Sequence, residues 1–349
     1  MPRIAVIPGD GIGREVLDEG LKVLRWLDRR HDLDLHFEQL PYGAERYLQT
    51  GLTITPEEME GLRAYDAIYL GALGDPRVPT NVHAKDILLG MRFQLDLYIN
   101  LRPVKLLDAR YCPLKGREPK DMRFTVFREN TEGLYTGIGG QFKRGTADEV
   151  AIEAELNTRK GVERIIRAAF EYAHARGLKR VCMSDKANAM RHGHDLWQRV
   201  FKLVAAEYPA IQASHLYVDV LTMEMVRAPD RFDVIVTNNL FGDIVTDLGA
   251  QLQGGIGLAA SGNIHPGQTS MFEPVHGSAP DIAGKGLANP LAAVLSAGMM
   301  LGYLGHADLE DRIEAAVREC LIADRITPEL GGTLSTSAVG DAVVAALQS

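Results

Sequence analysis

The sequence predicts an α/β protein, in which buried strands alternate with helices along most of the 349 residues. Short apolar, β-branched runs such as residues 4–7 and 232–237 are typical of buried strands. Segments with helical spacing follow several of them, and glycine or polar residues occupy the turns between. The length corresponds to roughly two domains. Since no Pro/Ser-rich linker separates them, we expect the domains to interleave.

The first strand, residues 4–7, leads through Pro-Gly-Asp-Gly-Ile-Gly at 8–13 into a helix that reaches about Leu27. The glycines at 9, 11 and 13 do not form a GxGxxG dinucleotide motif, because residue 14 is Arg. No GK[ST] follows, so a Walker loop is also excluded. Two interpretations remain: a tight strand-to-helix turn, or a loop that lets a ligand approach the backbone.

Three arginines occur within apolar sequence, which is unusual for surface residues. Arg92 and Arg102 lie within the stretch 92–103, and Arg128 ends the strand-like run 124–127, with Tyr135 shortly after it. Buried arginines need a carboxylate partner, which lies either inside the protein or on a ligand. The sequence leaves both possibilities open.

The middle of the chain places charged residues after predicted strands. Residues 136–158 are rich in Gly, Thr and charge and predict an extended arm, and residues 161–175 predict an amphipathic helix. Lys186 follows the strand 180–184, and Asp219 ends the strand 213–218. Because ligands of open α/β sheets bind at such strand ends, Lys186 is a candidate proton carrier, although an exposed lysine is the simpler interpretation.

Asp243 and Asp247 follow the strand 232–237 and stand four residues apart in a helical pattern. On a helix they share one face and repel each other unless a cation lies between them. A solvated helix face is the alternative. With Asp219 they offer three carboxylates and no matching Cys or His set, which suits Mg²⁺ or Mn²⁺.

A long polar loop at 271–290 carries many backbone donors, and connections of this length are often functional. It favours a nucleotide cofactor. Together with a metal, an arginine clamp, Lys186 and Tyr135, this suits oxidative decarboxylation of a 2-hydroxy acid. Metal-assisted hydrolysis of a phosphate ester is the main competitor.

Composition excludes several other classes of protein. The net charge of −8 and the pI near 5.7 argue against a nucleic-acid partner. No apolar run approaches the roughly 20 residues of a membrane span. The N-terminus enters a strand at once, so no signal peptide is expected. Three cysteines without CxxC spacing indicate reduced thiols, and we expect a cytoplasmic enzyme.

Five motifs, in order along the chain, resemble the metal-dependent β-decarboxylating dehydrogenases, which act on isopropylmalate, isocitrate, homoisocitrate, and tartrate or D-malate. The motifs occupy residues 8–13, 97–103, 185–188, 239–244 and 272–282. The resemblance implies two interleaved α/β domains sharing a long mixed β-sheet. Residues 1–100 plus 252–349 would bind the cofactor. Residues 101–251 would bind substrate and metal and form a homodimer through the arm.

The resemblance also implies residue roles. Arg92, Arg102 and Arg128 would hold the carboxylates of a malate-type substrate. Asp219, Asp243 and Asp247 would hold the divalent metal, with Asp219 and Lys186 reaching the site from the partner subunit. Lys186 would take the C2 hydroxyl proton, and Tyr135 would protonate the enol. The implied cofactor-binding residues are Ile12, His276, Gly277, Ser278, Ala279, Asp281, Ile282 and Asn289.

Two positions predict the cofactor. Relatives that use NADP carry a Lys-Tyr type pair where this chain has Asp281 and Ile282. An acidic side chain favours a free ribose hydroxyl, so NAD is the predicted cofactor.

The substrate tail is predicted from the helix before Arg92. Leu88 and Leu89 suit an isopropyl group, although a core-packing role is an alternative. Lys85 and Asp86 stand where the isopropylmalate pattern has a glutamate, and they keep tartrate or D-malate in second place. Homoisocitrate or isocitrate comes after these. A non-catalytic homologue is the alternative of a different class.

Overall fold

The computed structural model describes residues 1–348, which divide into two compact units. Unit 1 comprises residues 1–97, 105–119 and 250–348, and unit 2 comprises residues 98–104 and 120–249. Ten strands, five from each unit, form the mixed sheet structure of the chain. The predicted α/β class is therefore confirmed.

The segment 105–119 belongs to unit 1, whereas the sequence placed residues 101–251 in one domain. Its contacts explain the difference. The backbone N–H of Lys105 donates to Gln253 Oε1 at 2.7 Å, and the Lys105 ammonium pairs with Glu314. Arg110 pairs with Asp324 at 2.7 Å. Charged side chains thus attach this segment to residues near the C-terminus.

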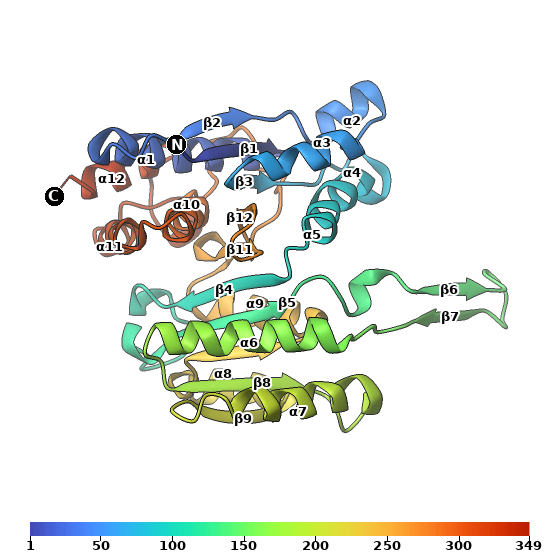
Figure 1. The fold of residues 1–349 in the computed structure, drawn as a ribbon. Helices are drawn as coiled ribbons and strands as arrows, with labels where there is room; N and C mark the ends of the chain where they lie inside the picture. The colour runs from blue at the N-terminus through green and yellow to red at the C-terminus, as the bar shows by residue number, and fades with distance from the viewer. Residues whose placement is uncertain (349) are drawn as a thin grey trace. The chain divides into compact units, whose positions relative to one another are not determined.

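Unit 1 has the strand order β2-β1-β3-β12-β11 (Figure 1). Neighbouring strands run parallel except β11, which is antiparallel to β12. The strands are β1 (Arg3–Gly9), β2 (His36–Gln39), β3 (Ala67–Ala72), β11 (Ala260–Ile264) and β12 (Ser270–Pro274).

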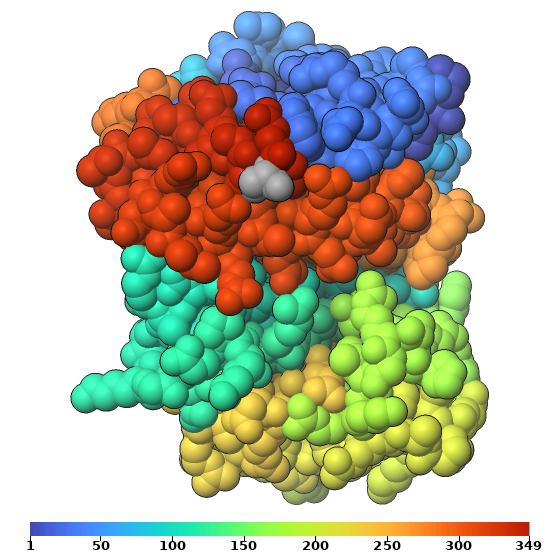
Figure 2. Space-filling model, turned by 90° about the vertical axis from the view of Figure 1, so that its left-hand side faces the viewer, coloured from blue at the N-terminus to red at the C-terminus, as the bar shows by residue number. Residues whose placement is uncertain are grey.

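The helices of unit 1 surround these strands. Helix α10 is buried along most of its length, as its uniformly apolar sequence requires, and it packs against α1 and α11. Figure 2 shows the C-terminal helices against the N-terminal segment on one face of the molecule. The helices are α1 (Gly13–His31), α2 (Ala44–Thr50), α3 (Pro56–Gly61), α4 (Val82–Ala84), α5 (Gly90–Gln94), α10 (Leu291–Tyr303), α11 (Ala307–Ile322) and α12 (Thr336–Ala346), with a π-helical turn (Lys85–Leu89) between α4 and α5.

Unit 2 has the strand order β4-β5-β10-β8-β9, and its last four strands run parallel. The strands are β4 (Ile99–Lys105), β5 (Arg123–Glu129), β8 (Arg180–Asp185), β9 (Gln212–Tyr217) and β10 (Val234–Thr237). Thr237 of β10 lies opposite Arg128 of β5 and Ser184 of β8. The carboxyl ends of these strands therefore meet at one edge, where ligands of α/β sheets bind.

Helices α6 (Arg159–Ala175), α7 (Arg191–Ala205), α8 (Val218–Arg227) and α9 (Asn239–Leu252) accompany these strands. The expected arm is an antiparallel hairpin of β6 (Gly139–Phe142) and β7 (Val150–Glu153), which projects from the rest of unit 2 in Figure 1. Among residues 1–348, no helix combines the length and the apolar character needed to cross a membrane.

A buried carboxylate joins α1 to α12. Gly340 leaves room for Glu19, since a Cβ at residue 340 would lie 1.8 Å from Glu19 Oε2. Lys22 contacts Glu19 at 2.5 Å and Asp341 at 2.8 Å. Burial raises the pKa of Glu19 above its ordinary value of 4.5, and Lys22 offsets this only in part because Asp341 is also near.

Glu19→Gln is expected to stabilise the protein at neutral pH. The raised folded-state pKa means that protonated Glu19 favours folding, and this contribution is lost as pH rises through the folded pKa. Melting temperatures of both proteins between about pH 4 and pH 8 should show the variant's advantage growing with pH. An advantage that is constant over this range would contradict the assignment to Glu19.

Candidate active site

Arg128 ties the end of β5 to the start of α9. Its side chain is 1% exposed. Its Nε and Nη2 donate to Asn239 Oδ1 at 3.0 and 2.7 Å, and its Nη1 donates to Asp243 Oδ1 at 2.5 Å. Gly242 makes this approach possible, because a Cβ there would lie 2.4 Å from Arg128 Cγ. A buried guanidinium and a carboxylate are thereby held in direct contact.

Tyr135 shares the same carboxylate. A 3₁₀ turn (Leu134–Thr136) presents its hydroxyl, which donates to Asp243 Oδ2 at 2.9 Å. The Arg128 guanidinium lies 5.2 Å from the centre of the Tyr135 ring. Burial and the Asp243 charge raise the pKa of the Tyr135 hydroxyl, so it keeps its proton near neutral pH. Burial opposes ionisation of Asp243, but Arg128 and the Tyr135 hydrogen bond outweigh it and lower its pKa.

Asp247 lies one turn further along α9, beside Arg102. Arg102 donates to Asn100 Oδ1 at 2.8 Å and to Thr246 Oγ1 at 3.0 Å, and its Nη1 lies 3.6 Å from Asp247 Oδ1. The Asp247 side chain is 64% exposed. Partial burial and the nearby Asp243 charge raise the pKa of Asp247 in spite of Arg102. Arg102, one of the three arginines expected to bind substrate carboxylates, thus has a carboxylate partner within the chain.

The two carboxylates on α9 fit the predicted divalent ion. Both are oxygen donors spaced by one helical turn, and their mutual repulsion would be relieved by a cation. Within residues 1–348, no three His, Cys, Asp or Glu side chains gather into a metal-binding cluster. Asp243 and Asp247 on α9 could therefore supply two of the three predicted metal ligands. The third, Asp219, lies on α8 and does not cluster with them in the described part of the chain.

Lys186 and Asp219 form their own ion pair. Lys186 follows β8 and Asp219 lies in the first turn of α8, and their charged groups are 2.8 Å apart. The Lys186 ammonium also lies 5.9 Å from the ring centre of Tyr217. Its hydrogen bond to Asp219 lowers the pKa of that carboxyl. Lys186 thus directly follows a strand, as the sequence predicted, whereas Asp219, which was expected to end a strand, lies in the first turn of helix α8.

Arg92 of unit 1 has a carboxylate partner inside the protein. Its Nη2 donates to Glu273 Oε1 at 3.1 Å, and Asn263 donates to the same oxygen at 2.8 Å. The Arg92 Nε is buried with no hydrogen-bond partner in the described residues. The internal salt bridge considered at the sequence level is therefore present, and one donor remains available.

Leu88 and Leu89 lie in the π-helical turn. Leu88 is half-buried and packs against a core cluster that includes Ile87 and Met91. Leu89 is also half-buried. The core-packing alternative therefore applies at least in part to Leu88, and the role of both residues in substrate binding stays a prediction.

The predicted cofactor loop packs closely on the glycine turn. Ile12 N–H donates to the Ser278 carbonyl at 2.8 Å, and a Cβ at Gly11 would lie 2.0 Å from that oxygen. Ile12 belongs to an apolar cluster against which Ala279 and Ile282 also pack. The glycines therefore allow both a tight strand-to-helix turn and the close approach of the loop backbone at Ser278.

His276 Nε2 in this loop is buried with no hydrogen-bond partner in the described residues. The Asn289 side chain interacts with Glu329 and partly offsets the rise that burial causes in the pKa of that carboxyl. Burial lowers the pKa of His276, so its ring is neutral near pH 7. Gly277 and Asp281 are exposed, whereas Ser278 is buried. The loop therefore offers a neutral imidazole, an amide and a free carboxylate, which are groups that fit a nucleotide.

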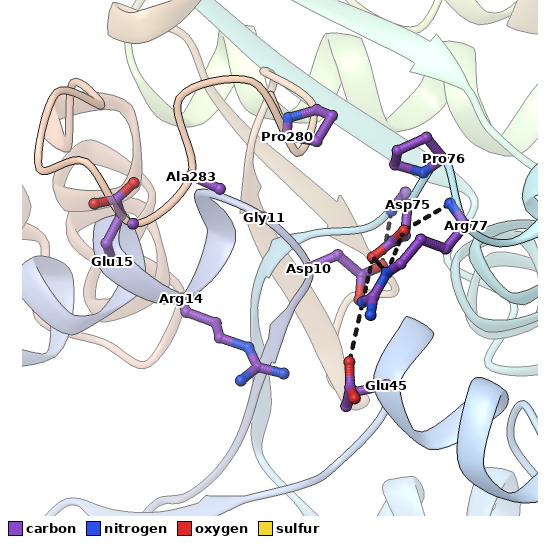
Figure 3. Close-up of a pocket in the computed structure, with 12 residues that line it drawn as sticks. Asp10, Gly11, Arg14, Glu15, Glu45, Asp75, Pro76, Arg77, Pro280 and Ala283 are labelled. Carbon is purple, nitrogen blue, oxygen red and sulfur yellow. Dashed lines mark hydrogen bonds and ion pairs between the residues drawn. The ribbon is translucent and has the colours of Figure 1, made fainter.

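A cavity of about 540 Å³ lies beside the loop and the glycine turn (Figure 3). Its wall includes Asp10, Gly11 and Arg14 from the turn, with Pro280 and Ala283 from the loop. Arg77 pairs with Asp75 at 2.7 Å and with Glu45 at 3.0 Å on the opposite side. The predicted cofactor segments therefore border an open space.

Residues 3–343 match the isocitrate/isopropylmalate dehydrogenase family. The chain belongs to this family. Two relatives named 3-isopropylmalate dehydrogenase, from Thermobifida fusca (strain YX) and Corynebacterium glutamicum (strain R), are each 50% identical to it. The aligned regions cover 97% of this chain and 96% of the first relative, and 99% and 100% for the second. An isocitrate dehydrogenase structure from Methylococcus capsulatus matches with a TM-score of 0.89 at 36% identity, covering 100% of both chains.

The predicted membership of the decarboxylating dehydrogenases is thus confirmed, and with it the assignment as an enzyme. The roles of individual residues stay predictions. In this dehydrogenase, sequence reasoning missed Asp10. Its buried carboxylate accepts from Ala44 N–H at 2.6 Å and Gly74 N–H at 2.8 Å and contacts His83 Nε2 at 2.8 Å. An acidic residue between two glycines was the only available signal.

Asp10→Ala is expected to destabilise the dehydrogenase by about 2 kcal/mol or more, because three buried donors lose their acceptor. Chemical unfolding measures the change, with exposed Asp18→Ala on α1 as the matched control. The KM for the cofactor should rise as the turn and the Gly74 loop separate. Equal stability of the two variants would rule out this role of Asp10.

Proposed function

We propose that the protein catalyses NAD- and divalent-metal-dependent oxidative decarboxylation of (2R,3S)-3-isopropylmalate to 2-oxoisocaproate and CO₂, a step of leucine biosynthesis. The observation that carries this proposal is the 50% identity, over nearly the whole chain, to relatives named 3-isopropylmalate dehydrogenase. The contact of Arg128, Tyr135 and Asp243 supports it, since it joins a carboxylate-binding group to a proton donor and a metal ligand.

Arg92, Arg102 and Arg128 bind the two substrate carboxylates in this proposal. Each is largely buried, so each offers a charge-assisted hydrogen bond away from bulk water. Their present partners, Glu273, Asp247 and Asp243, hold the guanidinium groups in place before substrate arrives. Leu88 and Leu89 contact the isopropyl tail, where each buried methyl group contributes about 1 kcal/mol.

The protons move between Lys186, the substrate and Tyr135. Lys186 takes the proton of the C2 hydroxyl as the C2 hydrogen leaves as hydride. When bound, NAD⁺ supplies the hydride acceptor and the divalent ion supplies positive charge near the oxygen that becomes an enolate. Loss of the C3 carboxylate as CO₂ leaves an enolate, and the protonated Tyr135 hydroxyl supplies a proton to C3 to give the 2-oxo acid. One proton is removed and one returned, so the reaction balances.

NAD binds through the 276–289 loop in this proposal. His276 Nδ1 donates to the Gly277 carbonyl at 3.0 Å, so the unprotonated Nε2 accepts a hydrogen bond from the adenosine half. Asn289 Nδ2 donates to the adenosine half, and Asp281 accepts from the ribose hydroxyls. Asp281 is exposed and carries a negative charge, so it would repel the 2′-phosphate of NADP. Ile12, Ala279 and Ile282 form an apolar support beneath the nucleotide.

The working unit is a homodimer in this proposal, with Lys186 and Asp219 completing the partner's site. Exposed apolar side chains on α8 and α9, including Met223 at 68% and Ile244 at 54%, would be covered by a second copy. The arm adds exposed Phe142 and Ile152. Three free thiols, at Cys112, Cys182 and Cys320, suit the reducing cytoplasm in which we expect the enzyme.

NADH formation should be fastest with 3-isopropylmalate in a panel with D-malate, tartrate, isocitrate and homoisocitrate. Activity should require Mg²⁺ or Mn²⁺ and disappear with EDTA. Faster turnover of D-malate or tartrate would favour the second candidate, which exposed Lys85 and Asp86 beside the tail residues support. Phosphate release without NADH would indicate a phosphatase, and NAD binding without turnover of any substrate a non-catalytic homologue.

Asp281→Lys with Ile282→Tyr should reverse the cofactor preference. The new charge attracts the 2′-phosphate, so kcat/KM should fall for NAD⁺ and rise for NADP⁺, each by about tenfold or more. Steady-state kinetics with both cofactors measures this, and the substrate KM serves as the internal control. A preference that stays with NAD⁺ would contradict the role of Asp281.

A further inference from the structure

A buried histidine lies directly behind the turn that carries Lys186. His194 is fully buried in the first turn of α7, and its Nδ1 accepts the backbone N–H of Lys186 at 2.7 Å. The Lys186 carbonyl accepts from the N–H groups of Ala189 and Met190 at 2.9 and 2.8 Å. Both main-chain polar groups of Lys186 are therefore hydrogen-bonded, and its side chain is paired separately with Asp219.

These contacts determine the tautomer of His194. A backbone N–H can only donate, so Nδ1 must be unprotonated and the proton lies on Nε2. Nε2 faces Glu155, whose Oε1 and Oε2 lie 3.3 and 3.2 Å away. Asn238 donates to Glu155 Oε1 at 2.6 Å. Burial opposes ionisation of Glu155, but the hydrogen bonds from His194 and Asn238 outweigh it and lower its pKa, so a carboxylate faces Nε2–H.

Glu155 belongs to the end of the arm, two residues after β7. Asn157 lies on the same side of this extended segment and accepts the indole N–H of Trp197 at 2.8 Å. Trp197 stands one helical turn after His194. Gly193 permits the approach, because a Cβ there would lie 2.5 Å from Asn157 Nδ2. The end of the arm is thus fitted against the first turn of α7.

We propose that Glu155 and His194 are positioning residues, which hold the main chain of Lys186 and link its place to the end of the arm. The backbone hydrogen bond to His194 fixes the main-chain position from which the Lys186 side chain extends. Glu155 keeps the imidazole in the tautomer that can accept this bond. The inference rests on the proposed proton-transfer role of Lys186. It adds two residues that touch neither substrate nor cofactor but act through a residue that does.

Amide hydrogen exchange at Lys186 tests the contact without any substrate. His194→Leu removes the acceptor, whereas His194→Asn places an amide oxygen where Nδ1 stood. Exchange should speed up in His194→Leu, stay near wild type in His194→Asn, and be unchanged in His192→Leu, an exposed control on the same helix. Unchanged protection of Lys186 in a folded His194→Leu protein would overturn the proposal, whether or not the proposed function holds.

Kinetics tests the consequence on the best substrate of the wild type. A displaced Lys186 should reduce kcat by about 10- to 100-fold in His194→Leu, leave the KM for NAD⁺ within about twofold, and raise the isotope effect with C2-deuterated substrate. His194→Asn should recover most of the loss. An equal loss in both variants without a change in isotope effect would mean a structural role only and would reject the inference.

If His194→Leu does not fold, the pair Glu155→Ala and Glu155→Gln replaces it. Gln keeps an acceptor for His194 Nε2–H, and Ala does not. Ala should therefore show faster Lys186 exchange and lower kcat than Gln, while identical behaviour of the two would overturn the link to the arm. A wild type that turns over none of the malates would defeat the proposed function alone, because the exchange result stands by itself.

Discussion

The contact of the buried Arg128 guanidinium with Asp243 and Asn239 connects the end of β5 to α9 and is central to unit 2. A guanidinium inside a protein is costly unless each side of it is satisfied, and here an amide oxygen and a carboxylate satisfy it. The same Asp243 accepts from Tyr135. Arg128 and Tyr135, which have different predicted roles, are thus coupled through one carboxylate, and a change in the charge of Asp243 would affect both.

Unit 1 positions its predicted cofactor segments in another way. The glycine turn and the 276–289 loop meet backbone to backbone, with Ile12 N–H on the Ser278 carbonyl. A side chain at Gly11 would prevent this approach. Asp10 then attaches the turn to the segments around Ala44 and Gly74. In unit 1, glycines without side chains and the buried carboxylate of Asp10 hold the segments together. Around Arg128, paired charges hold them together.

The catalytic role that we propose for Lys186 relies on supports that come from distant parts of the sequence. Lys186 follows β8 directly, Asp219 lies in the first turn of α8 just after β9, and Asn238 follows β10. Parallel pairing aligns the ends of these strands. Glu155 reaches the same region from the arm. An element that we expect to join two subunits therefore also contacts His194, which accepts the backbone N–H of the proposed proton carrier Lys186.

The sequence by itself determined the α/β class, the family and the identity of most candidate residues, because strand patterns, glycine turns and five motifs are local signals. It left undecided whether the arginines are paired within the chain, and the structure shows that Arg92 meets Glu273 and Arg128 meets Asp243. It missed Asp10, His194 and Glu155, and it grouped 105–119 with residues 120–249, whereas the contacts of the structure group this segment with unit 1. Those contacts join residues far apart in the chain, so only the tertiary structure, which brings buried donors and acceptors together, could decide them.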